Sequence, residues 1–222
     1  MPRKIVVIPA KSVSRRVPDK NWRPFSLGQS LVERKIKVAL GTQADLVIVS
    51  TDRVDVPGTF HNERVEVRPR DGHLCGDRVD LRRLFMQVLS GFEEDVVFWA
   101  HPTSPFVCAE TIDSAMEQCL FNPGCCVLGV KERREFYWTE SGPVNYDPIH
   151  QPRSQDLQPV YAVTGGVHCA FGRDFIGFGA VAFLPVKLVC LHFPEALDID
   201  DLDDWHLAQL VAGTNAMVNR ER

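Results

Sequence analysis

Short β-branched apolar runs alternate with amphipathic segments along this chain, and this alternation limits its fold more than any other feature. Apolar runs of this length predict strands, and apolar residues at helical spacing predict helices. We expect strands at Lys4 to Ile8, Leu46 to Val49, Val65 to Val67, Val96 to Ala100, Cys125 to Val130, Val163 to Phe171 and Lys187 to Phe193. We expect helices at Ser30 to Leu40, Asp80 to Leu89, Thr111 to Leu120 and Asp203 to Val211. Ser30 and Glu33 form a capping box, which makes the start of the first helix the best-defined boundary.

Several of these strands are apolar throughout, as a parallel sheet covered on both faces requires. The predicted fold class is therefore α/β: a doubly wound, mostly parallel sheet with helices on both faces. Ligands of such sheets bind beyond the carboxyl ends of the strands. This rule directs attention to the loops after Ile8, Val49, Ala100 and Val130.

The length and composition indicate a single domain spanning residues 1–222, because 222 residues with 45% hydrophobic content can bury a core without disulfides or structural metals. A net charge of -4 gives no field that would attract nucleic acid or an anionic membrane. No apolar run is long enough for a signal peptide or a membrane span, so we expect a cytoplasmic protein. The seven cysteines include no Cys-x-x-Cys pair, which argues against zinc.

Residues 131–161 interrupt the alternation with a polar, proline-bearing and aromatic segment. A segment of this length protrudes from the predicted sheet. It is a candidate lid, a dimer arm or a long surface loop.

The loop after the first strand, residues 8–21, carries Lys11, Arg15, Arg16 and Lys20 in a short span and is called the basic loop below. Cations and backbone N–H groups gathered at a strand end can neutralise the oxygens of a triphosphate. The alternative is a solvated basic loop without a ligand. Neither a Walker loop nor a dinucleotide-binding fingerprint is present.

The order of residues in the basic loop resembles the opening of the acylneuraminate cytidylyltransferases, or CMP-sialic acid synthetases, whose usual form is IPAR-x-GSKR-I-P-x-KN. The matching positions are Ile8, Pro9, Ala10, Ser14, Arg16, Pro18, Lys20 and Asn21, in register and without a gap. The resemblance implies CTP as the nucleotide, bound by Ala10, Ser12, Ser14, Arg16 and Asn21. It also implies that Lys20, Lys11 and Arg15 act in catalysis.

Two later motifs extend this resemblance to the nucleotide pocket. Ser50-Thr51-Asp52 matches the family's STD, and Arg68-Pro69 followed by Gly76-Asp77 matches its RP and small-Asp pair. By analogy, Arg68, Cys75 and Asp77 line the cytosine and ribose pocket. The competing interpretation of Ser50 to Asp52 is a turn or helix cap.

Two further motifs concern the acceptor. His101 to Phe106 resembles the family's QPTSPL, which implies sugar contacts from His101, Thr103 and Ser104, although His101 replaces a glutamine and could equally be a buried structural histidine. Residues 153–166 follow the pattern R-x-Q-x-x-P-x-x-Y-x-x-NG with one extra residue, which adds Gln155, Tyr161 and Thr164 as substrate-binding candidates. The planar guanidinium of Arg153 suits a carboxylate, so Arg153 is the candidate carboxylate anchor, with a surface arginine as the alternative.

Ala196 to Asp200 resembles the family's IDID motif. In an extended segment Asp198 and Asp200 point to the same side, where two carboxylates can hold Mg²⁺. We expect Asp203 to cap the final helix, and Asp201 and Asp204 to be solvated.

The resemblance covers nearly the whole chain and predicts transfer of CMP from CTP to an acidic, nonulosonate-like sugar with release of pyrophosphate. It also implies a homodimer in which residues 131–161 complete the partner's site. The chain departs from the family pattern at Lys11, Val13, Arg15, His101 and Thr164. These departures leave open a phosphonate acceptor or a catalytically silent binding protein, and a metal-dependent glycosyltransferase is a further alternative based on Asp198 and Asp200.

Overall fold

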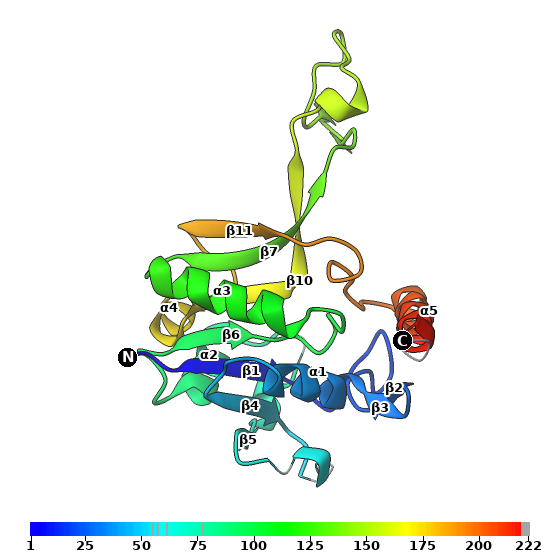
Figure 1. Cartoon of the computed structure of the whole chain (residues 1–222). Helices are drawn as coiled ribbons and strands as arrows, with labels where there is room; N and C mark the ends of the chain where they lie inside the picture. Colours follow the sequence, from blue (N-terminus) through cyan, green and yellow to red (C-terminus); the bar gives the residue numbers. More distant parts are fainter. Residues whose placement is uncertain (55, 57, 61, 77, 219–222) are drawn as a thin grey trace.

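The computed structural model describes residues 1–218 other than 55, 57, 61 and 77. In this part of the chain a seven-stranded sheet runs in the order β11-β7-β10-β6-β1-β4-β5 (Figure 1). Its strands are β1 (Lys4–Pro9), β4 (Leu46–Thr51), β5 (Val65–Pro69), β6 (Val96–Trp99), β7 (Cys126–Arg133), β10 (Val160–Phe171) and β11 (Val186–Cys190). Each predicted strand is present, with ends that differ by a few residues.

The central strands are parallel, and β10 runs antiparallel to its neighbours β6 and β7. Strands β1 and β4 are buried along almost their whole length, which confirms that their unbroken apolar runs belong inside a covered sheet.

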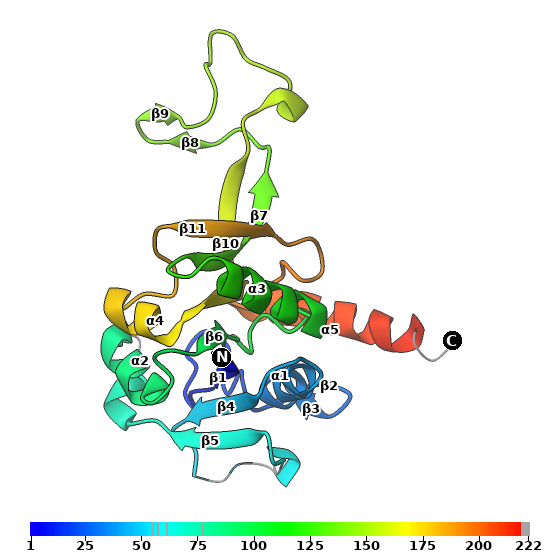
Figure 2. The ribbon, with the colours of Figure 1, turned by 60° about the vertical axis from the view of Figure 1, so that its left-hand side comes forward.

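Helices cover both faces of the sheet (Figures 1 and 2). On one face, α1 (Leu31–Leu40) and α3 (Ala109–Phe121) pack their apolar residues into one core cluster. On the other face, α2 (Leu81–Leu89) and α4 (Gly172–Phe178) form a second cluster. The doubly wound α/β fold expected from the sequence is therefore confirmed.

The predicted capping box of α1 is present. Ser30 Oγ accepts a hydrogen bond from the Glu33 amide at 3.2 Å, and Glu33 Oε2 accepts one from the Ser30 amide at 2.8 Å. Such a reciprocal pair satisfies two of the N–H groups that a helix start leaves unpaired, and N-caps of this kind contribute about 1 kcal/mol.

The last helix, α5 (Leu202–Val218), packs against the hairpin of β2 (Pro24–Ser26) and β3 (Gln29–Ser30). Its cap differs from the expectation, since Asp201 Oδ1 accepts from the amides of both Asp203 and Asp204 at 3.0 Å. Asp204 Oδ2 accepts in return from the Asp201 amide at 3.2 Å. The prediction that Asp203 caps the helix was therefore wrong. Asp201 caps it, and Asp204 accepts the reciprocal hydrogen bond. The helix begins at Leu202, one residue earlier than the apolar spacing indicated.

Residues 131–161, called the arm below, project from the body of the molecule (Figures 1 and 2). Strands β7 and β10 continue into the arm as a two-stranded ladder, and their register shifts between Val163 and His168. The arm also holds β8 (Trp138–Thr139), β9 (Gly142–Pro143) and a short 3-10 helix, η3 (Ser154–Asp156). Two more 3-10 helices, η1 (Gly58–Phe60) and η2 (Gly72–Leu74), lie in the body. Within the described residues, no helix combines the length and hydrophobicity that a membrane span requires.

Candidate active site

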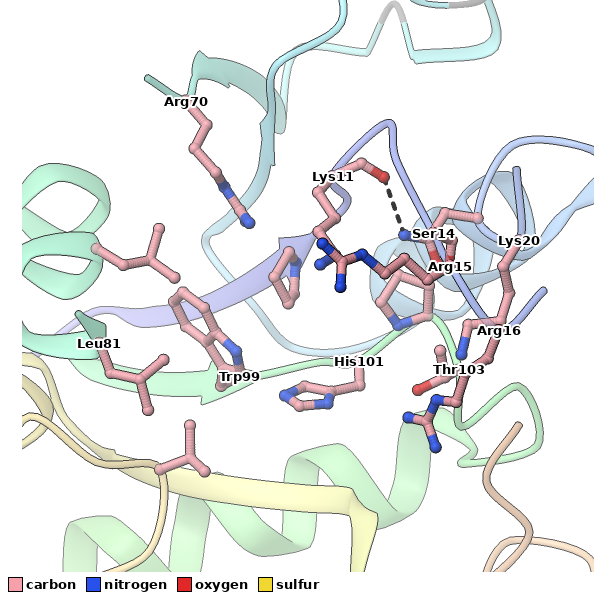
Figure 3. A pocket seen from close by; sticks show the side chains of 15 residues that line it. Lys11, Ser14, Arg15, Arg16, Lys20, Arg70, Leu81, Trp99, His101 and Thr103 are labelled. Carbon is pink, nitrogen blue, oxygen red and sulfur yellow. Dashed lines mark hydrogen bonds between the residues drawn. The ribbon is translucent and has the colours of Figure 1, made fainter. Parts of the chain in front are cut away.

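A cavity of about 630 Å³ opens at the carboxyl ends of β1 and β6, where the sheet topology predicted a ligand (Figure 3). Its volume lies in the range of sites that bind small molecules. It is lined by Pro9, Lys11, Ser14, Arg15, Arg16, Lys20, Asn21, Arg70, Leu81, Leu84, Trp99, His101, Pro102, Thr103 and Val181.

The basic loop supplies the cationic wall of this cavity, and Lys11, Arg15, Arg16 and Lys20 all take part in it (Figure 3). The loop is anchored from beneath by Val17, which is fully buried in the cluster formed with α5. Four cations on one wall of a cavity are suited to a polyanionic ligand.

Asn21 joins the same wall and is itself buried. Its Nδ2 donates to the carbonyl of Lys11 at 3.2 Å, whereas its Oδ1 has no hydrogen-bond partner among the described residues. A buried acceptor without a partner is costly unless a ligand or water satisfies it. This oxygen is therefore an unsatisfied acceptor in a residue that lines the cavity.

Lys20 connects the basic loop to the acidic residues predicted at the metal site. Its side chain is only 8% exposed, and Nζ donates to the carbonyl of Ile199 at 2.5 Å. Burial lowers the pKa of Lys20, while the nearby carboxylates of Asp198 and Asp200 act against that shift. The Lys20 ammonium thus lies between the basic loop and the two candidate metal ligands, Asp198 and Asp200.

Residues 198–200, called the aspartate segment below, lie outside any helix or strand, and Ile199 is fully buried between the two aspartates. The Ile199 amide donates to the carbonyl of Thr103 at 2.9 Å. Asp198 Oδ1 accepts from Ser104 Oγ at 3.1 Å, and Asp200 Oδ1 accepts from Arg16 Nη2 at 2.6 Å.

A glycine makes room for the first of these carboxylates. A Cβ added to Gly165 of β10 would lie 2.6 Å from Asp198 Oδ2, closer than any real side chain tolerates. No group of three or more His, Cys, Asp or Glu side chains suited to a metal occurs in the described residues. The carboxylates of Asp198 and Asp200 are hard oxygen donors, of the kind that Mg²⁺ prefers beside water and phosphate oxygens.

His101 forms part of the cavity floor (Figure 3). Its ring lies against that of His168, with centroids 5.2 Å apart, and its enclosed Nε2 has no hydrogen-bond partner among the described residues. Burial first, and then the neighbouring His168, lower the pKa of His101 to about 3. The imidazole is therefore neutral near pH 7.

The arginine that lines the cavity near β5 is not the one expected from the sequence. Arg68 does not line the cavity; it donates to Glu66 Oε1 at 2.6 Å and to the carbonyl of Val88 at 2.8 Å. Arg70 lies there instead, 8% exposed, with Nη2 donating to the carbonyl of Ser50 at 3.1 Å. The reason is position along the strand, because Arg68 lies within β5 whereas Arg70 lies beyond its carboxyl end.

Three other predicted nucleotide residues do not line the cavity with their side chains. Ala10 is fully buried, and its amide donates to the carbonyl of Ser50 at 2.8 Å. Ser12 donates through both its amide and its hydroxyl to the carboxylate of Asp52. Cys75 is half-buried, its thiol 3.6 Å from the carbonyl of Asp71, and burial raises its pKa. Asp77 lies outside the described residues.

The acceptor candidates divide into two groups. Thr103 lines the cavity beside His101, and Ser104 is buried behind it. Thr164 lies where β10 leaves the body, and its hydroxyl accepts from the Gly166 amide at 3.3 Å. This chain's own cavity therefore receives few of the side chains assigned to the acceptor.

Arg153, Gln155 and Tyr161 belong to the arm and do not line this cavity. Arg153 is 74% exposed and pairs with Asp156 at 2.7 Å. The two-stranded ladder of β7 and β10 carries these residues away from the carboxyl ends of β1 and β6. The structure thus does not bring the predicted carboxylate anchor to the basic loop of the same chain.

The sequence reasoning missed Arg70, Trp99 and the apolar pair Leu81 and Leu84. The position of Arg70 just past the end of β5 was a signal that could have identified it. Leu81 and Leu84 read only as core positions of an amphipathic helix, and nothing in their spacing indicated a cavity wall.

Comparison with known proteins agrees with this geometry. The sequence model of one protein family, described as cytidylyltransferase, matches residues 5–148. CMP-N,N'-diacetyllegionaminic acid synthase of Legionella pneumophila is 28% identical over 227 residues, which cover 95% of this chain and 97% of that protein. Pseudaminic acid cytidylyltransferase of Campylobacter jejuni is 26% identical, with 95% and 97% covered.

A solved structure of CMP:2-keto-3-deoxy-manno-octonic acid synthetase complexed with CTP superposes with a TM-score of 0.67 at 13% identity, covering 96% of this chain and 99% of that one. A nucleotidyl transferase from Methanothermobacter superposes with a TM-score of 0.63 at 17% identity, covering 96% and 99%. These likenesses concern the fold, whereas the matched family also concerns the chemistry. The chain belongs to the cytidylyltransferase family and is a nucleotidyltransferase that uses CTP.

Proposed function

We propose that this enzyme transfers CMP from CTP to a nonulosonic acid and releases pyrophosphate. The observation that carries the proposal is the hydrogen bond from Lys20 Nζ to the Ile199 carbonyl, which joins the aspartate segment to a lysine that lines the cavity. The relatives named for legionaminic and pseudaminic acid extend over nearly the whole chain, which supports this class of acceptor.

The proposed reaction is an in-line displacement at the α-phosphorus of CTP. The acceptor hydroxyl forms a new P–O bond as its proton is released, and the bond from the α-phosphorus to the bridging oxygen breaks, so that pyrophosphate leaves with that oxygen. Lys20, Lys11 and Arg15 on the cationic wall stabilise the charge that develops on the phosphate oxygens. Charges already fixed by the fold need little rearrangement during the reaction.

The aspartate segment suits a resident Mg²⁺, since it offers two hard oxygen donors beside the cationic wall. Asp198 and Asp200 would hold the ion, and Ser104 Oγ and Gly165 already place the Asp198 carboxylate. When bound, magnesium neutralises charge on the phosphate oxygens. Arg16 pairs with Asp200 at 2.6 Å and so keeps that carboxylate close to the basic loop.

The acceptor side of the site needs a second copy of the chain. In the proposed homodimer, the partner's arm brings Arg153 to the acceptor carboxylate, because Arg153 does not line the cavity of its own chain and the arm projects from the body of the molecule (Figure 1). His101, a neutral ring that lines the cavity, would contact the acceptor.

Two other proposals stay open for the acceptor and for activity. One is a small phosphonate, which would also meet a cationic wall. The other is a nucleotide-binding protein without turnover, given the departures at Lys11, Val13, Arg15, His101 and Thr164.

The test is release of pyrophosphate from CTP and magnesium with a panel of acceptors: sialic, legionaminic, pseudaminic and ketodeoxy-octonic acids and a small phosphonate. We expect release with at least one nonulosonic acid and none without an acceptor. Release with the phosphonate alone would move the activity to that acceptor. CTP binding without release from any acceptor would favour the silent protein.

A further inference from the structure

Lys35 is a buried cation for which the proposed reaction has given no role. It lies on α1 behind the cavity and is 1% exposed. Its Nζ donates to the carbonyl of Ser104 at 2.6 Å. In the part of the chain that the structure describes, no carboxylate lies within ion-pair distance of this ammonium.

Burial of this amine is unfavourable, and the surrounding charges do not remove the cost. Desolvation first, and then Arg34 on the same helix, lower the pKa of Lys35, which is about 7 once all its neighbours are counted. Asp198, Glu195 and Cys108, which face it from other elements, act in the opposite direction. An apolar side chain of similar volume would avoid this desolvation cost. The stability of the fold therefore does not explain why a lysine occupies position 35.

Among the described residues, the one hydrogen bond of the Lys35 ammonium leads to the aspartate segment. The carbonyl of Ser104 is held by Lys35, and the hydroxyl of the same residue donates to Asp198 Oδ1 at 3.1 Å. The preceding carbonyl, that of Thr103, accepts from the Ile199 amide at 2.9 Å. Thr103 and Ser104 therefore form a two-residue bridge from Lys35 to the aspartate segment.

We propose that Lys35 is a positioning residue for the reaction: through the Thr103–Ser104 bridge, it holds Asp198 in the orientation that magnesium binding needs. This inference rests on the proposed function, in which Asp198 is a magnesium ligand. Outer partners of this kind typically change metal affinity by about 10- to 100-fold when they are removed.

The sign of the effect separates positioning from simple electrostatics. An ammonium close to the carboxylates repels a cation, so a purely electrostatic Lys35 weakens magnesium binding and its removal strengthens it. A positioning Lys35 gives the opposite result, because its removal releases Asp198.

The experiment compares Lys35→Met with Lys37→Met, a matched change on the exposed side of the same helix. Magnesium is titrated by calorimetry into the CTP complex of each variant, after subtraction of the heat for magnesium and CTP alone. For Lys35→Met we expect magnesium binding weaker by about tenfold, CTP affinity without magnesium within about twofold of wild type, and a Tm equal or higher. Lys37→Met is expected to match wild type in all three.

Unchanged or stronger magnesium binding in Lys35→Met would overturn the proposal, as would an equal loss of CTP affinity, which indicates general damage. If Lys35→Met does not fold, Ser104→Ala removes the hydroxyl at the other end of the bridge, and wild-type magnesium affinity there would also overturn it. Asp198→Asn checks the premise, because unchanged magnesium affinity in that variant moves the metal elsewhere. No acceptor is needed, so an enzyme that binds magnesium in this way yet releases no pyrophosphate with any acceptor contradicts the proposed function and leaves the role of Lys35 intact.

Discussion

The cavity and the arm are built in opposite ways. The cavity gathers residues from loops far apart in the sequence, and its contacts cross the molecule, as in the 179-residue separation of Lys20 and Ile199. The arm makes mostly local contacts, such as Arg153 with Asp156 and the Phe136 ring 4.9 Å from that of Tyr146. Its large apolar side chains stay outside, with Trp138 61% and Ile149 83% exposed.

This difference separates two kinds of functional prediction. A residue at the end of a core strand is placed by the fold of its own chain. In the proposed homodimer, a residue on the arm reaches a cavity only through the second chain. The following predictions test that distinction, beginning with the residues of the cavity.

The largest effect is expected from the aspartate segment. Asp200→Asn keeps the side-chain shape but removes the charge proposed to hold magnesium against the phosphates. We expect turnover to fall by the factor that corresponds to a loss of about 3 to 4 kcal/mol of transition-state stabilisation. Asp203→Asn, on the exposed first turn of α5, is the matched control and should stay near wild type. Steady-state pyrophosphate release measures both, and equal activity in the two variants would place the metal elsewhere.

Lys20 should come next. Lys20→Ala removes a buried ammonium that can make charge-assisted hydrogen bonds to a phosphate, and we expect a loss of about 1.5 to 3 kcal/mol in CTP binding or turnover. Exposed Lys187→Ala serves as the control, since such lysines seldom contribute more than a fraction of a kcal/mol. Calorimetry with CTP decides the matter. If both variants bind CTP equally, the basic loop does not hold the phosphates.

The arm is tested by Arg153→Ala, which should weaken acceptor binding by about 1.5 to 2 kcal/mol while leaving CTP affinity unchanged. The sharper measurement mixes this variant with Lys20→Ala. If the arm completes the partner's site, one site of each mixed dimer is intact, and random pairing should restore about a quarter of the wild-type activity. No recovery in a mixture shown to contain mixed dimers would mean that Arg153 does not act across the dimer.

The smallest effect concerns His101. His101→Gln should change the KM for the acceptor by the factor that corresponds to about 1 kcal/mol and leave the KM for CTP unaltered. The reason is that the neutral ring would make an ordinary uncharged hydrogen bond to the acceptor. With a pKa of about 3, His101 does not titrate between pH 5.5 and 7.5, so both enzymes should show pH profiles of the same shape.

His101 should also affect stability in acid. The unfolded chain binds a proton near pH 6.5 that the folded ring accepts only near pH 3, so wild type loses stability as the pH falls through this window. His101→Gln should lose less over the same range. Thermal unfolding measured from pH 7 to 4 checks this, and parallel curves for the two proteins would show that the ring is already charged when folded.

Much of the fold was predictable because its signals are local. Ser30 and Glu33 are three residues apart and cap the helix that follows them wherever it packs. The burial of the aspartate segment follows the expected alternation in part, since Ile199 is buried, Asp198 half-buried and Asp200 exposed.

Only the tertiary structure decided which side chains meet. Helical spacing gives Lys35 no special role, and only the fold brings its ammonium to the carbonyl of Ser104, 69 residues away. Arg70 rather than Arg68 lines the cavity because β5 ends between them. The direction of the arm follows from the β7 and β10 pairing, which no local pattern in residues 131–161 encodes. The sequence by itself thus determined the strands, the helices and the types of residue at the strand ends, through interactions between near neighbours. Burial, partners and distance to the cavity depend on elements that only folding brings together.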